Sequence, residues 1–258
     1  MEIKRAAALY FSPTGGTRRI ASRLASALCP GAEELDVTVR PAAREFAADE
    51  LAVIAAPVFG GRVPALSVER LRGITAHGTP AVVVAVYGNR AYEDALLELC
   101  DAAAERGFRV IAAGAFIARH SIVPDIAAGR PDSADFAALE RFAAAVREKL
   151  AAAPAAEALS AVTPPGSRPY REFGGVPMHP SAPKSKCGQC GKCAAECPTG
   201  AIDPAAPEKT DGGKCITCMR CVAVCPHYAR RLNPAMLAAT SVKLKKACAA
   251  RREPEFYL

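Results

Sequence analysis

The sequence has 258 residues, a length suited to two domains, and it contains 11 cysteines. No stretch is long and apolar enough to span a bilayer, and the N-terminal residues lack a signal-peptide pattern, so we expect neither a membrane-embedded nor an exported protein. The net charge of +7 is uneven, because residues 1–160 hold 18 Lys and Arg against 19 Asp and Glu, whereas residues 161–258 hold 15 against 7.

A phosphate-binding loop is predicted near the start of the chain. Residues 6–11 form an apolar run typical of a buried parallel strand, and a helical pattern extends from Arg18 to Leu28. Backbone N–H groups at the start of such a helix favour an anion. The loop has neither the Lys-Ser or Lys-Thr ending of a Walker A motif nor the GxGxxG of a dinucleotide site, and an ordinary helix cap is the alternative. The residues predicted to contact the phosphate are Ser12, Thr14, Gly15, Gly16 and Thr17.

Further strand patterns alternate with helical patterns. The predicted strands are residues 33–37, which are weak and peripheral, 51–56, 81–87 and 108–118. The predicted helices are residues 93–106 and 133–150, the second capped by Asp132 or Ser133. Five strands in this alternation predict an α/β fold with a doubly wound parallel sheet. In such a sheet the ligand binds beyond the carboxyl ends of the strands.

The predicted phosphate loop resembles the T/S-x-T-G-x-T loop of flavodoxins, which holds the phosphate of FMN. This resemblance implies FMN as a cofactor and a sheet with strand order 2-1-3-4-5. It also implies that the loops after the third and fourth strands flank the flavin ring. The residues expected in these loops are Pro57, Val58, Phe59, Gly60, Gly61, Tyr87, Gly88, Asn89, Arg90 and Tyr92.

Several side chains at this sheet edge have expected roles beside a flavin. Phe59 or Tyr92 is expected to stack on the ring, with core packing as the alternative for either. His120 is a candidate proton relay, or else a structural histidine. A cation at this edge is expected to stabilise the reduced, anionic flavin, the alternative being a solvated surface charge. The candidate cations are Arg62, Arg90 and Arg119.

The most specific pattern in the chain is C-x2-C-x2-C-x3-C-P, which occurs from Cys187 to Pro198 and again from Cys215 to Pro226. This is the spacing with which two-cluster bacterial ferredoxins hold 4Fe-4S clusters, the fourth cysteine of each run binding the other cluster. Zinc sites or disulfides are the alternatives, and the close third cysteine disfavours them. The expected ligands of the first cluster are Cys187, Cys190, Cys193 and Cys225, and those of the second are Cys197, Cys215, Cys218 and Cys221. The other cysteines, Cys29, Cys100 and Cys248, are expected to be buried structural thiols.

Two segments flank the cysteine motifs. Residues 151–186 hold seven prolines and predict a stiff connector, which suits two cofactor sites held at a fixed distance. Asn233 and Pro234 predict the start of a helix that runs to about Arg252. Its lysines form a basic face, for which we favour solvation over docking of a partner.

The whole arrangement resembles the ferrodoxin family, in which a flavodoxin-like domain is fused to a ferredoxin domain with two clusters. The resemblance rests on the cysteine motifs, on residues 57–64 and 87–92, on the pair His120 and Ser121, and on residues 253–258. It implies a division into a flavodoxin-like FMN-binding domain, a proline-rich connector and a small α+β ferredoxin-like domain with a C-terminal helix. These parts are expected at residues 1–153, 154–183 and 184–258.

These patterns predict an electron-transfer iron–sulfur flavoprotein that passes single electrons between two 4Fe-4S clusters and FMN, linking a low-potential donor to a redox partner. The alternative is an FMN-dependent reductase of a small molecule, fed through the clusters, with His120 or Tyr92 as proton donor. The basic second half predicts an acidic docking face on the partner protein. Nucleic acid is disfavoured because no helix or aromatic platform suits it. Thiolate ligands without an export signal predict a cytoplasmic location, and no oligomeric state is predicted.

Overall fold

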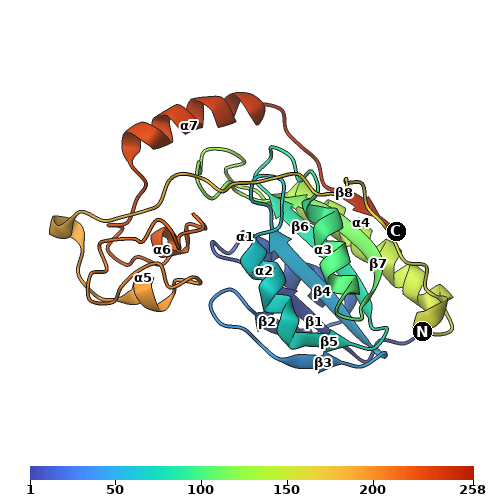
Figure 1. The fold of residues 1–258 in the computed structure, drawn as a ribbon. Helices are drawn as coiled ribbons and strands as arrows, with labels where there is room; N and C mark the ends of the chain where they lie inside the picture. Colours follow the sequence, from blue (N-terminus) through green and yellow to red (C-terminus); the bar gives the residue numbers. More distant parts are fainter.

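The computed structural model describes residues 1–258 and contains a large body built on a sheet and a smaller body that holds the cysteine motifs (Figure 1). The strands are β1 (Arg5–Tyr10), β2 (Glu33–Asp36), β3 (Arg44–Phe46), β4 (Glu50–Pro57), β5 (Ile74–Ala76), β6 (Pro80–Tyr87), β7 (Arg109–Ile117) and β8 (Glu255–Tyr257). The helices are α1 (Gly16–Leu28), α2 (Ala65–Arg70), α3 (Ala95–Ala104), α4 (Ser133–Ala152), α5 (Lys192–Ala195), α6 (Arg220–Ala223) and α7 (Pro234–Ala247).

The central sheet has six strands in the order β2-β1-β4-β6-β7-β8. The first five strands of this row are all parallel. Counted along the chain within the sheet, they have the order 2-1-3-4-5, which confirms the predicted doubly wound fold. The five predicted strands are all present, and their ends differ from the prediction by at most one residue. Long apolar runs are decisive here, because a parallel strand is covered on both faces.

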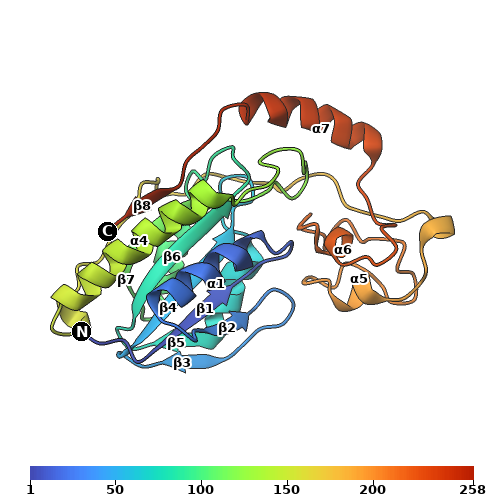
Figure 2. The same ribbon diagram turned by 180° about the vertical axis from the view of Figure 1, so that it is seen from behind.

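Two apolar layers hold the helices against the sheet. One layer of 24 buried residues joins the sheet to α1 and α4, with Leu24 and Phe142 among its fully buried members. The other layer, of 27 buried residues, joins the opposite face to α3, and α2 packs against it. Figures 1 and 2 show α2 and α3 in front of the sheet from one side and α1 and α4 in front from the other. Asp132 caps α4 by accepting hydrogen bonds from the N–H groups of Ala134 and Asp135.

The structure corrects the sequence analysis in several elements. Strand β8 adds a sixth, antiparallel strand to the expected five. It comes from residues 184–258, which the sequence analysis assigned to the ferredoxin-like domain. Strands β3 and β5 form a separate two-stranded parallel sheet that was not predicted, because three residues show no clear period. Helix α2 was also missed, and α7 ends at Ala247 rather than near Arg252.

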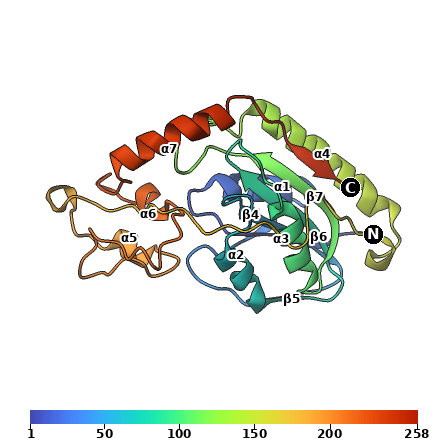
Figure 3. The same ribbon diagram turned by 45° about the horizontal axis from the view of Figure 1, so that its top comes forward.

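The smaller body contains the short helices α5 and α6, and two passages of chain join it to the sheet. Residues 154–183 lead into it, and α7 with the residues after it leads back to β8, as Figure 3 shows from above. An antiparallel bridge between Ser181 and Arg231 fastens the two passages together. No helix of the structure is both long enough and apolar enough to cross a membrane.

Candidate cofactor sites

A pocket of about 470 Å³ lies at the carboxyl edge of the sheet, where the smaller body faces it. Loops that follow β1, β4, β6 and β7 supply one side of its wall. The other side comes from the connector, the second cysteine motif and α7. The predicted flavin residues that line this pocket are Thr14, Gly16, Thr17, Pro57, Val58, Phe59, Gly60, Tyr87, Gly88, Arg90 and His120.

The loop before α1 has the geometry of an anion cradle. Gly15 has a φ of 86°, a left-handed conformation that favours glycine. The Ser12 hydroxyl accepts a hydrogen bond from the Arg18 N–H (2.9 Å), so it supports the loop from below and does not line the pocket. The N–H groups of Gly16 and Thr17 lie in the first turn of α1, where they have no intrahelical partner. These residues therefore fit a phosphate group.

Two glycines of the pocket wall each have an aromatic ring packed against the position where a Cβ would lie. A Cβ on Gly60 would lie 2.2 Å from the ring of Phe173, a connector residue that also lines the pocket. A Cβ on Gly88 would lie 2.5 Å from the imidazole of His120. Phe59 and Arg62 close the turn around Gly60 with reciprocal backbone hydrogen bonds. Phe59 itself lines the pocket, so it stays a candidate for stacking on a flavin ring.

Gly61, Asn89 and Tyr92 do not line the pocket, although they were expected there. A Cβ on Gly61 would meet the carboxylate of Glu93. The Asn89 amide donates to the carbonyls of Cys248 and Ala250, both at 2.9 Å, and accepts from the Arg252 N–H at 3.0 Å. Asn89 therefore fastens the chain after α7.

Tyr92 serves the same purpose at β8. Its hydroxyl donates a hydrogen bond to the Glu255 carboxylate (2.8 Å) and is also hydrogen-bonded to the Tyr257 hydroxyl (2.8 Å). Its ring packs edge-on against Tyr87. These contacts occupy the side chain, so Phe59 is the better candidate of the two aromatic residues for stacking on a flavin ring.

The three arginines of this edge differ in their partners. Arg62 forms an ion pair with Glu98 (2.7 Å), and Arg90 forms one with Glu93 (2.8 Å). Arg119 donates only to the carbonyl of Pro124 (2.9 Å) and has no carboxylate partner. Arg119 is consequently the cation that is free to face an anionic ligand.

His120 has a defined tautomer. Its Nδ1 accepts hydrogen bonds from the N–H groups of Ile122 (3.2 Å) and Val123 (3.1 Å). Burial, and then the nearby charge of Arg90, lower the pKa of His120 below its usual value. The imidazole is therefore neutral near pH 7 and carries its proton on Nε2. That N–H is a hydrogen-bond donor in the pocket wall.

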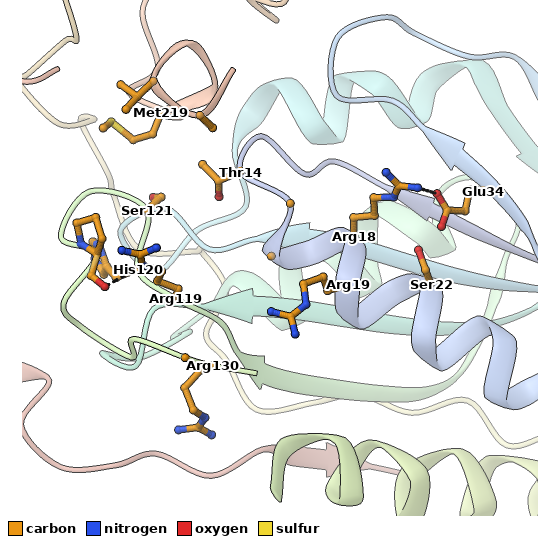
Figure 4. A pocket seen from close by; sticks show the side chains of 16 residues that line it. Thr14, Arg18, Arg19, Ser22, Glu34, Arg119, His120, Ser121, Arg130 and Met219 are labelled. Carbon is orange, nitrogen blue, oxygen red and sulfur yellow. Dashed lines mark hydrogen bonds and ion pairs between the residues drawn. The ribbon is translucent and has the colours of Figure 1, made fainter. Parts of the chain in front are cut away.

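A second, basic pocket of about 890 Å³ adjoins the first across the loops at Thr14 and His120. Figure 4 shows its arginines on α1 and on the loop after β7. Arg18 is paired with Glu34 (2.7 Å). Arg19 has no carboxylate partner and lies 5.7 Å from the centre of the Phe136 ring. Residues 219, 222 and 223 of the smaller body complete the wall of this pocket.

The eight motif cysteines gather into two groups around two small cavities. One cavity is lined by Cys187, Cys190, Cys193 and Cys225, and the other by Cys197, Cys215, Cys218 and Cys221. Each group takes three cysteines from one motif and the last cysteine from the other, which is the crossed arrangement that the spacing predicts. The structure thus brings together the residues of each expected ligand set.

The surroundings of these cysteines suit thiolate ligands of iron. Backbone N–H groups lie 3.3 Å from the sulfur of Cys197 and 3.4 Å from those of Cys215 and Cys225. Such N–H···S contacts stabilise charge on cluster sulfurs. Burial raises the pKa of the Cys218 thiol to about 12, so this sulfur needs a positive partner such as iron to become a thiolate.

The family comparison agrees with this geometry. Residues 179–226 match the family model of a 4Fe-4S dicluster domain. The smaller body carries an iron–sulfur domain of the ferredoxin type. The comparison with curated protein sequences finds no match.

Among solved structures, the chain is similar to rubredoxin oxygen:oxidoreductase from the anaerobe Desulfovibrio gigas, with 12% identity and a TM-score of 0.38. The similarity covers 58% of this chain and 37% of that one, so the present chain matches little more than a third of that protein. A likeness of this size assigns no function.

Sequence reasoning missed the part of the pocket wall that comes from outside the sheet. This part includes Phe173 of the connector, Ile216 and Thr217 of the second motif, and Lys243 and Leu244 of α7. No local pattern marks these residues as neighbours of the sheet edge. The only available signal was the stiffness of the connector, which implied a fixed distance between the halves.

Proposed function

We propose that this protein is an electron-transfer iron–sulfur flavoprotein with two 4Fe-4S clusters and one FMN. The observation that carries the proposal is the position of Cys218, which lines both the second cysteine cavity and the pocket at the sheet edge. A cluster ligand in the wall of the flavin pocket gives electrons a short path between the two cofactors. The eight motif cysteines are the proposed ligands, in the crossed sets described above.

FMN, when bound, accepts one or two electrons and so joins single-electron donors to two-electron chemistry. In this proposal the N–H groups of Gly16 and Thr17 bind its phosphate. Phe59 stacks on the ring, and Nε2 of His120 donates a hydrogen bond to its polar edge. Leu244 of α7 supplies part of the apolar wall of the pocket.

The difference in exposure between the two cysteine sets supports a direction across the molecule. Cys190 of the first set is exposed, whereas Cys218 and Cys221 of the second set are buried. Lys186 precedes the first motif and Lys192 lies within it; both are exposed and take part in no ion pair. We therefore propose that a redox protein with an acidic docking face meets the first set, and that the second set faces the flavin.

The test starts with anoxically purified protein, in which iron and acid-released FMN are counted on the same sample. We expect about eight irons and one FMN per chain. In Cys190→Ser the iron content should fall to about four per chain, and reduction of the FMN by a reduced acidic ferredoxin should be lost. Cys29→Ser, which alters a cysteine outside both sets, is the matched control. An unchanged rate of FMN reduction in Cys190→Ser contradicts the proposed path.

The basic pocket favours one second candidate, an FMN-dependent reductase of an anionic small molecule. This pocket shares Thr14, Gly16, Arg119, His120 and Ser121 with the flavin pocket, and its volume is large enough for a separate ligand. Anoxic reoxidation of the reduced protein by a panel of carboxylates and phosphates tests this candidate. Saturable reoxidation that Arg119→Gln weakens supports the reductase, and its absence leaves electron transfer alone.

A further inference from the structure

Arg230 is a cation buried inside the smaller body, which holds the cysteine motifs. Only 3% of the residue is exposed, and it lines the cavity of the first cysteine set. Nη1 lies 3.8 Å from the sulfur of Cys193. A guanidinium group remains charged at any ordinary pH, and such groups are rarely buried without a charged partner.

The protein partners of Arg230 are all neutral. Nη2 donates to the carbonyl of Pro180 (2.6 Å) and to the hydroxyl of Thr210, and Nη1 donates to the carbonyl of Pro207. Nε is buried and has no hydrogen-bond partner. Arg230 belongs to none of the ion pairs of the structure, so no carboxylate oxygen lies within 4.0 Å of it. Its positive charge is therefore not compensated by any side chain.

Arg230 lies against both cysteine sets. It lines the cavity of the first set together with Cys193. Two of its hydrogen-bond acceptors, Pro180 and Thr210, line the cavity of the second set. Cys193 and Cys221 also share a small apolar cluster with Ile202. Arg230 thus lines the first cavity and contacts residues that line the second.

We propose that Arg230 is the positioning residue that compensates the negative charge of both clusters and raises their reduction potentials. A 4Fe-4S cluster with four thiolates carries a net charge of about −2 when oxidised, and one added electron makes it about −3. A buried positive charge stabilises the reduced form more than the oxidised form, because the attraction grows with the charge. The first cluster feels the larger effect, since Arg230 contacts its ligand Cys193. This inference rests on the proposed function only in requiring that both clusters are present.

The experiment is a redox titration of the purified, cluster-loaded full chain, followed by electron paramagnetic resonance. At a fixed potential, Arg230→Gln should lower the ratio of reduced to oxidised first cluster by about tenfold, which is about 59 mV for a one-electron couple. The second cluster should shift in the same direction by less. Arg231→Gln is the matched control, because Arg231 is the next residue, is exposed, and contributes only backbone hydrogen bonds to Ser181.

Arg230→Lys separates charge from architecture. It keeps the positive charge but loses the planar fork that reaches Pro180, Pro207 and Thr210. If Arg230→Gln fails to hold iron, Arg230→Lys provides the second measurement, and its potentials should stay near those of the wild type. Loss of iron from Arg230→Gln that Arg230→Lys restores also supports a role of the charge.

Two outcomes overturn the inference. One is equal potentials in the wild type and Arg230→Gln with iron content unchanged. The other is an equal shift in Arg230→Gln and Arg231→Gln, which makes the effect one of net charge only. Either result leaves the proposed function intact, because both clusters are then still present. A wild-type protein that binds no iron instead ends the proposed function itself.

Discussion

The sheet body, here called the sheet half, and the smaller body with the cysteine motifs, here called the cluster half, are stabilised by different interactions. The sheet half has two apolar layers of 27 and 24 buried residues, whereas the apolar groups in and around the cluster half contain three buried residues each. A segment of about 50 residues with so little apolar burial does not reach a stable fold by hydrophobic packing alone. We therefore expect the sheet to fold through its own apolar layers and the cysteine-containing part to depend on bound iron.

Removal of iron should have the largest effect. Anoxic chelation should release the clusters and unfold residues 187–226, because metal binding supplies the folding free energy of that segment. Strands β4 and β6 should keep their protection from hydrogen exchange, since both are buried in the two apolar layers. Hydrogen exchange followed by mass spectrometry measures both regions in one sample. Simultaneous loss of protection in β4 and β6 contradicts the division between the halves.

Truncation of a side chain in the core of the sheet should destabilise the sheet and leave iron binding unchanged. Phe142 is fully buried, and its ring lies 5.2 Å from that of Phe256 in β8. Phe142→Ala should lower the free energy of unfolding of the sheet half by about 3–5 kcal/mol, because it leaves a cavity. Iron content per folded chain should not change. Phe136→Ala on the same helix is the control, since Phe136 is only half-buried and should lose less.

The smallest expected effect is a pH dependence where the two halves meet. The pKa of His120 is lowered by burial and by Arg90, so the unfolded chain binds a proton more readily than the folded one. Stability is therefore complete above the ordinary pKa of 6.5 and decreases as the pH falls from there towards the folded pKa. Urea unfolding of the wild type and of His120→Gln between pH 5 and pH 8 measures this contribution. Identical pH profiles for the two proteins rule it out.

The sheet and the cysteine sets could be predicted because their signals are local. Buried parallel strands appear as apolar runs, and the crossed grouping of the cysteines follows from their spacing. The roles of Asn89 and Tyr92 could not be predicted, since their partners lie about 160 residues further along the chain. Nothing local marks Arg230 either, because only the folded structure removes it from water without a carboxylate partner.

The contribution of α7 to the pocket was also beyond local reasoning. The lysines of the helix predict only a solvated face, and none of its residues is fully buried in the structure. Its position becomes clear from the segment after it, which Asn89 and β8 fasten to the sheet. Membership in the ferrodoxin family, the domain boundaries and the FMN contacts stay predictions.

Strand β8 has a consequence for the order in which the chain matures. During synthesis the edge of β7 can pair with β8 only after the whole cluster half has left the ribosome. Until then β7 presents an open edge of unpaired backbone groups, which invites pairing with other chains. If the smaller body waits for iron before it folds, this edge stays open for longer. We therefore expect a shortage of iron to favour aggregation of the newly made chain.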